Sequence, residues 1–263
     1  MIALLGVPWD GGSSFERGAA AGPAAVRARL HSAAGNGHAE SGRDALAALI
    51  DCGDAELPHD EAQALAAIQL AAEQAAVEGP VLAIGGDHSV TLPLLRAAAR
   101  RHGPLNVLHI DAHPDLYPEL DGRRFSNASP FARGLEEGLI AALIQLGIRA
   151  NTPPQRAMAQ RWNVLQFGPD AIADFAPASL FAPLYISIDI DGFDPAFAPG
   201  VAHPEAGGLL PRQLIGLLQR LPVAWVGADV VEVLPARDSS GITATLAAKL
   251  VKELVDANLA VRG

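Results

Sequence analysis

Residues 105–115 read LNVLHIDAHPD, an apolar run that passes directly into a dense set of polar side chains. The run Leu105–Ile110 is nearly continuous in apolar character, which is typical of a strand covered on both faces in a parallel sheet. Two other segments share this arrangement: VLAI at 81–84 leads into GGDHS, and LYISI at 184–188 leads into DIDGFD. Ligands bind beyond the carboxyl ends of parallel strands. We therefore expect the three polar segments to meet at one edge of a sheet.

Apolar runs alternate with helical segments along the rest of the chain, which predicts an α/β fold. We expect a three-layer α/β/α sandwich with a mainly parallel sheet of about eight strands. The expected strands are 2–7, 48–52, 81–84, 105–110, 142–146, 162–167, 183–189 and 224–232. The expected helices are 22–31, 60–78, 89–101, 128–138, 169–175, 210–221 and 240–259. No linker divides the 263 residues, so residues 1–263 are expected to form one domain.

The composition narrows the classes of function. The net charge is -10 and no basic stripe is present, which argues against nucleic acid and against an anionic membrane surface. No apolar run approaches the roughly 20 residues of a membrane span, and Met1–Val7 is too short for a signal-peptide core. Cys52 is the only cysteine, which fits a reducing cytosol. We expect a soluble, cytoplasmic protein that acts on a small molecule.

The segment after residue 110 has the spacing of a metal site. Asp111, His113 and Asp115 lie two residues apart, so in an extended segment their side chains point the same way. Asp189 and Asp191 repeat this spacing after another strand. Alone, DIDGFDP could be a solvated acidic loop, but the coincidence of several such segments favours a metal site.

His88 adds a second imidazole from a turn in which the preceding glycines let the backbone bend closely. Alone, its GDHS segment could simply begin a helix. Four carboxylates in one crevice would repel one another, and two divalent cations would neutralise them. Carboxylate oxygens with a minority of imidazoles favour manganese over zinc. Two such ions, about 3.5–4 Å apart, lower the pKa of a shared water, so the pattern predicts a dinuclear metallohydrolase.

Glu232 ends the expected strand 224–232 and should also reach the crevice. A carboxylate there can accept two hydrogen bonds from a planar guanidinium group. The alternative is a structural or surface glutamate.

The motifs GGDHSV, HIDAHPDLY, SIDIDGFDPAFAPGV and GADVVEVLPARD together resemble the ureohydrolase family of arginases and agmatinases, over nearly the whole chain. The stretches SNASPFAR, FAPGVAHPEAGGL and ITATLAAKLVKEL are most similar to its plant and bacterial arginase/agmatinase-like branch. This resemblance implies an arginase-like α/β/α fold, two Mn²⁺ per chain and a homotrimer or homohexamer. The implied reaction is hydrolysis of the guanidino group of arginine or agmatine to urea and an amine.

The resemblance also implies roles for single residues. His88 and Asp115 would bind one metal ion, His113 and Asp191 would bind the other, and Asp111 and Asp189 would serve both. Glu232 would bind the guanidinium group. Asp115 is also placed to relay a proton to the leaving amine.

Asn127 departs from the family pattern, because members often carry a histidine at this place in the SNAS segment. A carboxamide does not titrate near neutral pH. If the histidine shuttles protons, its loss costs on the order of 10²–10⁴ in rate. Alternatively, Asn127 makes a neutral hydrogen bond to a different substrate. His203 is a further candidate substrate contact, and His109 is either a partner of the metal site or a buried structural histidine.

The loop 118–131 is expected to choose the substrate. Its Glu119 and Asp121 suit an amine, whereas its Arg123 and Arg124 suit a carboxylate. We place arginine or agmatine first. The alternatives are another guanidino or formimino compound (guanidinobutyrate, guanidinopropionate or formiminoglutamate) and a weakly active metal-binding oligomer.

Overall fold

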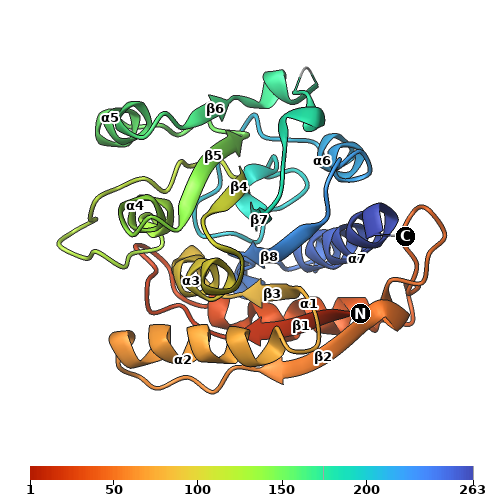
Figure 1. Cartoon of the computed structure of the whole chain (residues 1–263). Coiled ribbons are helices and arrows are strands. Elements are labelled where there is room, and N and C mark those ends of the chain that lie inside the picture. Colours follow the sequence, from red (N-terminus) through yellow and green to blue (C-terminus); the bar gives the residue numbers. More distant parts are fainter. Residues whose placement is uncertain (174, 263) are drawn as a thin grey trace.

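One continuous sheet of eight parallel strands forms the centre of the computed structural model, which describes residues 1–173 and 175–262 (Figure 1). The strands lie in the order β2-β1-β3-β8-β7-β4-β5-β6. Their bounds are β1 Ile2–Val7, β2 Leu49–Asp54, β3 Val81–Gly85, β4 Leu105–Ile110, β5 Ile140–Leu146, β6 Leu165–Phe167, β7 Leu184–Asp189 and β8 Trp225–Val231. The predicted parallel sheet is confirmed.

Helices cover both faces of the sheet (Figure 1). One layer contains α2 (Glu61–Ala75), α3 (Thr91–His102), α4 (Pro130–Glu136) and α5 (Pro153–Arg161). The other layer contains α1 (Gly22–Leu30), α6 (Pro211–Leu218) and α7 (Ile242–Arg262). This arrangement is the predicted three-layer α/β/α sandwich.

The continuous apolar runs follow from this double cover. In β1, Ile2 and Leu4 join the core beneath α1 and α7, whereas Leu5 and Val7 join the core beneath α2 and α3. Every residue of β1 is buried. Successive side chains of a strand point to opposite faces, so a strand with two cores must be apolar at every position.

Two segments differ from the expectation. Helix α5 was not predicted, because its opening Pro153-Pro154 resembles a break, yet proline is well suited to the first turn of a helix. The expected helix 169–175 is instead a 3₁₀ turn over Pro169–Ala173, and position 174 lies outside the described residues. Pro177 favours the extended backbone seen at Ala176, which ends the helical region early.

The register of the four central strands positions the polar segments. Ile84 pairs with Val230, Val230 with Ile188, and Ile188 with Ile110, so one row of residues crosses β3, β8, β7 and β4. Ile84, Ile188 and Ile110 each lie directly before a polar segment named above, and Val230 lies two residues before Glu232. The polar segments therefore leave the sheet side by side.

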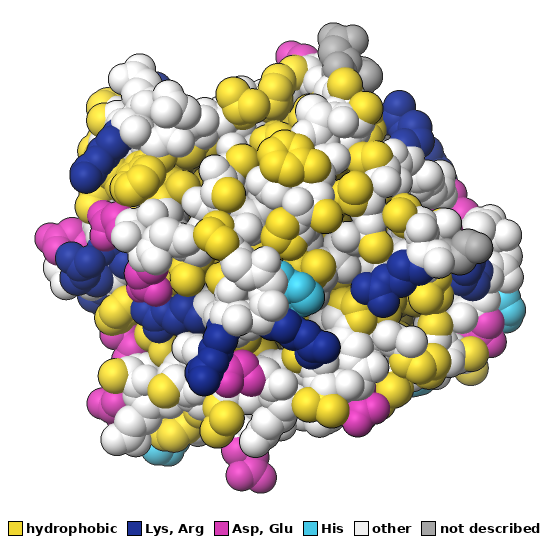
Figure 2. Space-filling view, viewed as in Figure 1, with side chains coloured by type: hydrophobic (Ala, Val, Ile, Leu, Met, Phe, Trp, Pro, Cys, Tyr) yellow, Lys and Arg dark blue, Asp and Glu magenta, His cyan; other side chains and the backbone are white. Residues whose placement is uncertain are grey.

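Among the described residues, no helix is both long and apolar enough to cross a membrane. On the face shown in Figure 2, hydrophobic side chains are interspersed with basic and acidic ones. This face therefore carries a mixed surface rather than one of a single charge.

Gly86 lies in the polar segment GGDHS at the end of β3, and a substitution at Gly86 tests how tightly this segment packs. A Cβ at Gly86 would overlap the carbonyl oxygen of Trp9, which accepts a hydrogen bond from the Asp87 N–H at 2.9 Å. We expect Gly86→Ala to lower the free energy of unfolding by about 1–3 kcal/mol, as for other overpacked sites. Urea denaturation measures this change. Gly216→Ala in α6 is the matched control, because no heavy atom lies within 4 Å of its added Cβ; equal stability of the two variants would contradict the prediction.

Candidate metal centre

The six predicted metal ligands converge at the carboxyl edge of the sheet. They are His88, Asp111, His113, Asp115, Asp189 and Asp191; all are buried except His113, which is half-buried. The Nδ1 atom of His88 lies 2.9 Å from Asp115 Oδ2. It also lies 3.2 Å from Asp111 Oδ2 and 3.2 Å from Asp189 Oδ2.

His113 is the centre of a second group. Its Nδ1 atom lies 3.1 Å from Asp191 Oδ2 and 3.4 Å from Asp111 Oδ1. Asp111 therefore reaches both groups, with Oδ2 toward His88 and Oδ1 toward His113. Each group combines an imidazole nitrogen with carboxylate oxygens, as a divalent transition metal requires.

The hydrogen bonds behind His88 set its tautomer. Ser187 Oγ donates to Asp229 Oδ1 at 2.6 Å, so it accepts from His88 Nε2 at 3.0 Å. Asp229 is held as an acceptor by two more hydroxyl groups, those of Tyr185 at 2.7 Å and Thr91 at 3.2 Å. His88 Nδ1 is thus left buried without a hydrogen-bond partner among the described residues. A buried lone pair that faces three carboxylates fits a metal cation.

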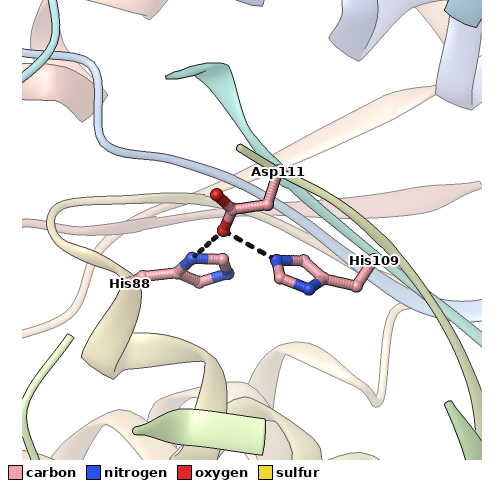
Figure 3. Close-up of side chains that lie close together, drawn as sticks. All are labelled: His88, His109 and Asp111. Carbon is pink, nitrogen blue, oxygen red and sulfur yellow. Dashed lines mark hydrogen bonds and ion pairs between the residues drawn. The ribbon is translucent and has the colours of Figure 1, made fainter. Parts of the chain in front are cut away.

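Figure 3 shows a third imidazole beside Asp111, that of His109. One ligand atom from each of His88, His109 and Asp111 lies close enough to the other two for the three residues to hold an ion. However, Gln145 Nε2 donates to the carbonyl oxygen of Pro114 at 2.6 Å and to His109 Nδ1 at 2.9 Å. The proton of His109 is then on Nε2, which donates to Asp111 Oδ2 at 2.8 Å. Of the two alternatives for His109, the structure favours a hydrogen-bonding partner of the site.

The pKa values of the cluster reflect its negative charge. Burial alone lowers the pKa of His88, but the close carboxylates of Asp111, Asp115 and Asp189 outweigh it and raise the pKa well above the usual value. Burial likewise opposes ionisation of His113, whereas Asp191 and Asp111 raise its pKa to about 12. Burial and the charge of Asp111 raise the pKa of Asp115 to about 7. The shifts follow from carboxylates that lie close together away from water, where their charge favours the binding of protons or other cations.

Two site residues have strained backbones. Asp115 has φ 50° and Glu232 has φ 65°, a left-handed conformation that disfavours residues other than glycine. Hydrogen bonds hold both segments in place: Glu232 N–H donates to the Gly86 carbonyl at 2.8 Å, and Leu116 N–H, directly after Asp115, donates to the side-chain Oε1 of Gln155 at 3.1 Å. Strained residues of this kind concentrate at functional sites.

Glu232 and Asn127 lie together beside the cluster. Glu232 Oε1 accepts from the His88 N–H at 2.8 Å and from Asn127 Nδ2 at 3.2 Å. Burial and the charge of Asp87 raise the pKa of Glu232 to about 8. Asn127 therefore orients Glu232 through a neutral hydrogen bond.

A cavity of about 440 Å³ opens above these residues. Both Asn127 and His203 line it, as do Tyr117 and Thr152 on its outer wall. Glu119, Asp121, Arg123 and Arg124 do not. The loop 118–131 instead reaches the cavity through Leu120, Asn127 and Ala128.

The two arginines of that loop are engaged elsewhere. Arg123 donates to Glu61 at 2.8 Å, and Arg124 lies 3.5 Å from Glu136. Charge balance counted along a loop does not reveal which side chains turn toward neighbouring helices.

Sequence reasoning missed Glu205 and Arg149. Glu205 lines the cavity, with Oε1 3.8 Å from His113 Nε2. Arg149 Nη2 donates to the carbonyl oxygens of Glu205 at 2.7 Å and Asp191 at 2.9 Å. Arg149 thus links the backbone at Glu205 to the backbone at Asp191, one of the predicted metal ligands. The only signal in the sequence was the position of Glu205, two residues after His203.

The profile of the Arginase family matches residues 1–256. The chain belongs to this family. Arginase 1 of Arabidopsis thaliana is 38% identical over 96% of the chain and 79% of its own length. Proclavaminate amidinohydrolase of Streptomyces clavuligerus is 38% identical over 97% of the chain and 87% of its own length. The solved structure of arginase from Medicago truncatula superposes with a TM-score of 0.91 at 36% identity, covering 98% of this chain and 87% of that one.

Membership confirms the predicted ureohydrolase class. This arginase-family chain is a hydrolase that cleaves C–N bonds of linear amidines, the class of compounds that includes the guanidino groups. The two relatives named arginase and proclavaminate amidinohydrolase share the same identity with it. Overall similarity therefore does not select the substrate.

Metal binding should depend on pH, because protons compete for His88 and His113, whose pKa values are raised. Protonated imidazoles prevail at low pH, so metal affinity should increase as pH rises. We expect the dissociation constant for Mn²⁺ to fall by up to about tenfold per pH unit for each proton displaced, between about pH 6 and pH 9. Calorimetry in buffers of different ionisation enthalpy measures both affinity and proton release. An affinity independent of pH, without proton release, would contradict this expectation.

Proposed function

We propose that this chain is a dimanganese amidinohydrolase that converts arginine or agmatine to urea and an amine. The arrangement of two imidazole–carboxylate groups around a shared Asp111, beside a cavity that contains Glu232, carries this proposal. Four carboxylates and two imidazoles favour manganese among the divalent metals.

The proposed metal ligands follow the two groups. His88 and Asp115 hold one ion, His113 and Asp191 hold the other, and Asp111 and Asp189 serve both. When bound, the ions activate a water for attack on the guanidinium carbon and offset the charge that develops there.

Glu232 is the proposed partner of the substrate guanidinium. Its Oε1 atom is occupied by the His88 N–H and by Asn127, which leaves Oε2 for the ligand. A cationic guanidinium favours the ionised carboxylate, whose pKa is raised in the free protein.

Asp115 is the proposed proton carrier. During hydrolysis the C–N bond to the leaving amine breaks, and a proton from water must reach the leaving nitrogen. Asp115 Oδ2 lies 2.9 Å from His88 Nδ1 in the cluster, so as a proposed ligand its carboxylate would lie next to the water that the ions activate and could pass on the proton released there. Asn127 takes no part in this transfer, because its carboxamide does not titrate.

The cavity supports a substrate with an amine at its far end. No lysine or arginine of the described chain lines it, whereas the carboxylate of Glu205 does. A substrate whose only second charge is a carboxylate would meet like charge and no cation. His203 lies beside this carboxylate on the cavity wall and is the proposed second contact of the substrate tail.

The family resemblance supports a homotrimer or homohexamer, and the single exposed Cys52 supports a reducing, cytoplasmic compartment. We propose a small guanidino compound as the ligand, and neither nucleic acid nor a membrane as a partner.

An assay of urea release tests the proposed function. The manganese-loaded protein is compared on arginine, agmatine, 4-guanidinobutyrate and 3-guanidinopropionate, with Asp189→Ala as the control. We expect urea from arginine or agmatine and none above background from the control. Absence of urea from all four substrates, with metal bound, would rule out the assignment. Formamide released from formiminoglutamate would identify the alternative substrate class.

Glu205→Lys tests the choice of substrate tail. It replaces an attractive charge by a repulsive one, so the kcat/KM ratio of agmatine to 4-guanidinobutyrate should fall by roughly tenfold, given that partly exposed ion pairs contribute about 1 kcal/mol or less each. Glu205→Gln, which removes the charge alone, should give an intermediate ratio. Metal content is measured in each variant, because Glu205 lies near His113. A ratio that does not change in either variant would contradict an amine site at Glu205.

A further inference from the structure

Four side chains form a hydrogen-bonded relay from the substrate cavity to Asp111. Asn151, which lines the cavity, donates through Nδ2 to Gln166 Oε1 at 2.8 Å. Gln166 Nε2 donates to Gln145 Oε1 at 2.7 Å, and Gln145 Nε2 donates to His109 Nδ1 at 2.9 Å. His109 Nε2 then donates to Asp111 Oδ2 at 2.8 Å. Every donor in the relay points toward Asp111.

The carbonyl oxygen of Pro114 fixes this direction. A carbonyl oxygen can only accept, so the Gln145 amide must present its NH₂ group there, at 2.6 Å. The second hydrogen of the same NH₂ group then points at His109 Nδ1, which must be unprotonated. The opposite tautomer of His109 would place two N–H groups against each other. Aligned bonds of this kind polarise and strengthen one another.

Each carboxylate oxygen of Asp111 accepts one N–H hydrogen bond. Oδ2 accepts from His109, and Oδ1 accepts from the backbone N–H of His113 at 2.6 Å. The same two oxygens face His88 Nδ1 and His113 Nδ1, the centres of the two metal groups. Figure 3 shows Asp111 between the imidazoles of His88 and His109. Both oxygens are thereby held in the orientation that serves two ions.

Burial makes the relay costly to break. His109 and Gln145 are fully buried on β4 and β5, where the double cover calls for apolar residues. Burying such polar groups is unfavourable unless each is hydrogen-bonded. The residues directly before and after each of them are apolar, so the pair departs from the local pattern of these strands.

We propose that His109 and Gln145 are positioning residues, which hold Asp111 as a shared metal ligand by locking His109 as an Nε2–H donor. This inference rests on the proposed function in one respect, since it takes Asp111 to be a ligand of both ions. On this proposal, the hydrogen bonds of the relay increase the affinity of the site for metal ions by holding Asp111 in place.

A pair of variants at position 109 tests the donor. Glutamine can place an amide nitrogen near the position of imidazole Nε2, whereas methionine has a similar length and no donor. We expect His109→Met to weaken Mn²⁺ binding by about 10–100-fold, as for other partners of metal ligands, and His109→Gln to recover most of that loss. Competition with a chelating dye measures both sites. Equal affinity of His109→Met and wild type, or equally weak binding by both variants, would overturn the proposal.

The tautomer of His109 provides a second readout. Nitrogen-15 spectra of the Zn²⁺-loaded protein should show His109 protonated on Nε2 and bare on Nδ1. Gln145→Met should allow the opposite tautomer and weaken metal binding. Phe131→Leu is the packing control, because the Phe131 ring lies 4.0 Å from that of His109; it should lower stability and leave the tautomer unchanged. A proton on Nδ1 in the wild type would overturn the relay.

The same data separate the two proposals. A wild-type protein that binds no metal would refute the proposed function, and the tautomer of the metal-free protein would still test the relay. Two bound metals with an unchanged tautomer and affinity in Gln145→Met would refute the relay alone.

Discussion

Mutual repulsion among four buried carboxylates is the constraint on which the rest of this structure depends. Asp111, Asp115, Asp189 and Asp191 meet where water is largely excluded, so their charges are poorly screened. Cations must offset them, and in the free protein the imidazoles do so by taking protons, which explains the raised pKa of His88. The parallel sheet makes this convergence possible, because four neighbouring strands end at one edge in matching register.

The hydrogen bonds on the far side of His88 and His109 from the carboxylates fix the orientation of both imidazoles. Asp229 and Ser187 set the tautomer of His88, and Gln145 sets that of His109. In both cases an acceptor that cannot donate fixes the direction of a buried network. The fixed direction leaves the lone pair of His88 Nδ1 facing the carboxylates, where a cation could bind. It also orients Asp111 between His88 and His113.

Family membership and substrate choice rest on different parts of the molecule. The metal-ligand motifs lie on the ends of buried strands, whereas the far wall of the cavity is built by loops held by Arg149 and other long-range contacts. Relatives with different names share the same identity with this chain. The strand ends therefore carry the motifs shared by the family, and loop residues such as Glu205 line the rest of the cavity.

Local patterns in the sequence determined the strands, the sandwich and the six clustered candidate ligands, because apolar runs and two-residue spacing act over a few neighbouring residues. The spatial order of the strands, with β8 and β7 between β3 and β4, came only from the tertiary structure. The same is true of Glu205 in the cavity and of Arg123 turned toward Glu61. These features depend on contacts between residues far apart in the chain, whose geometry is set only when the layers pack.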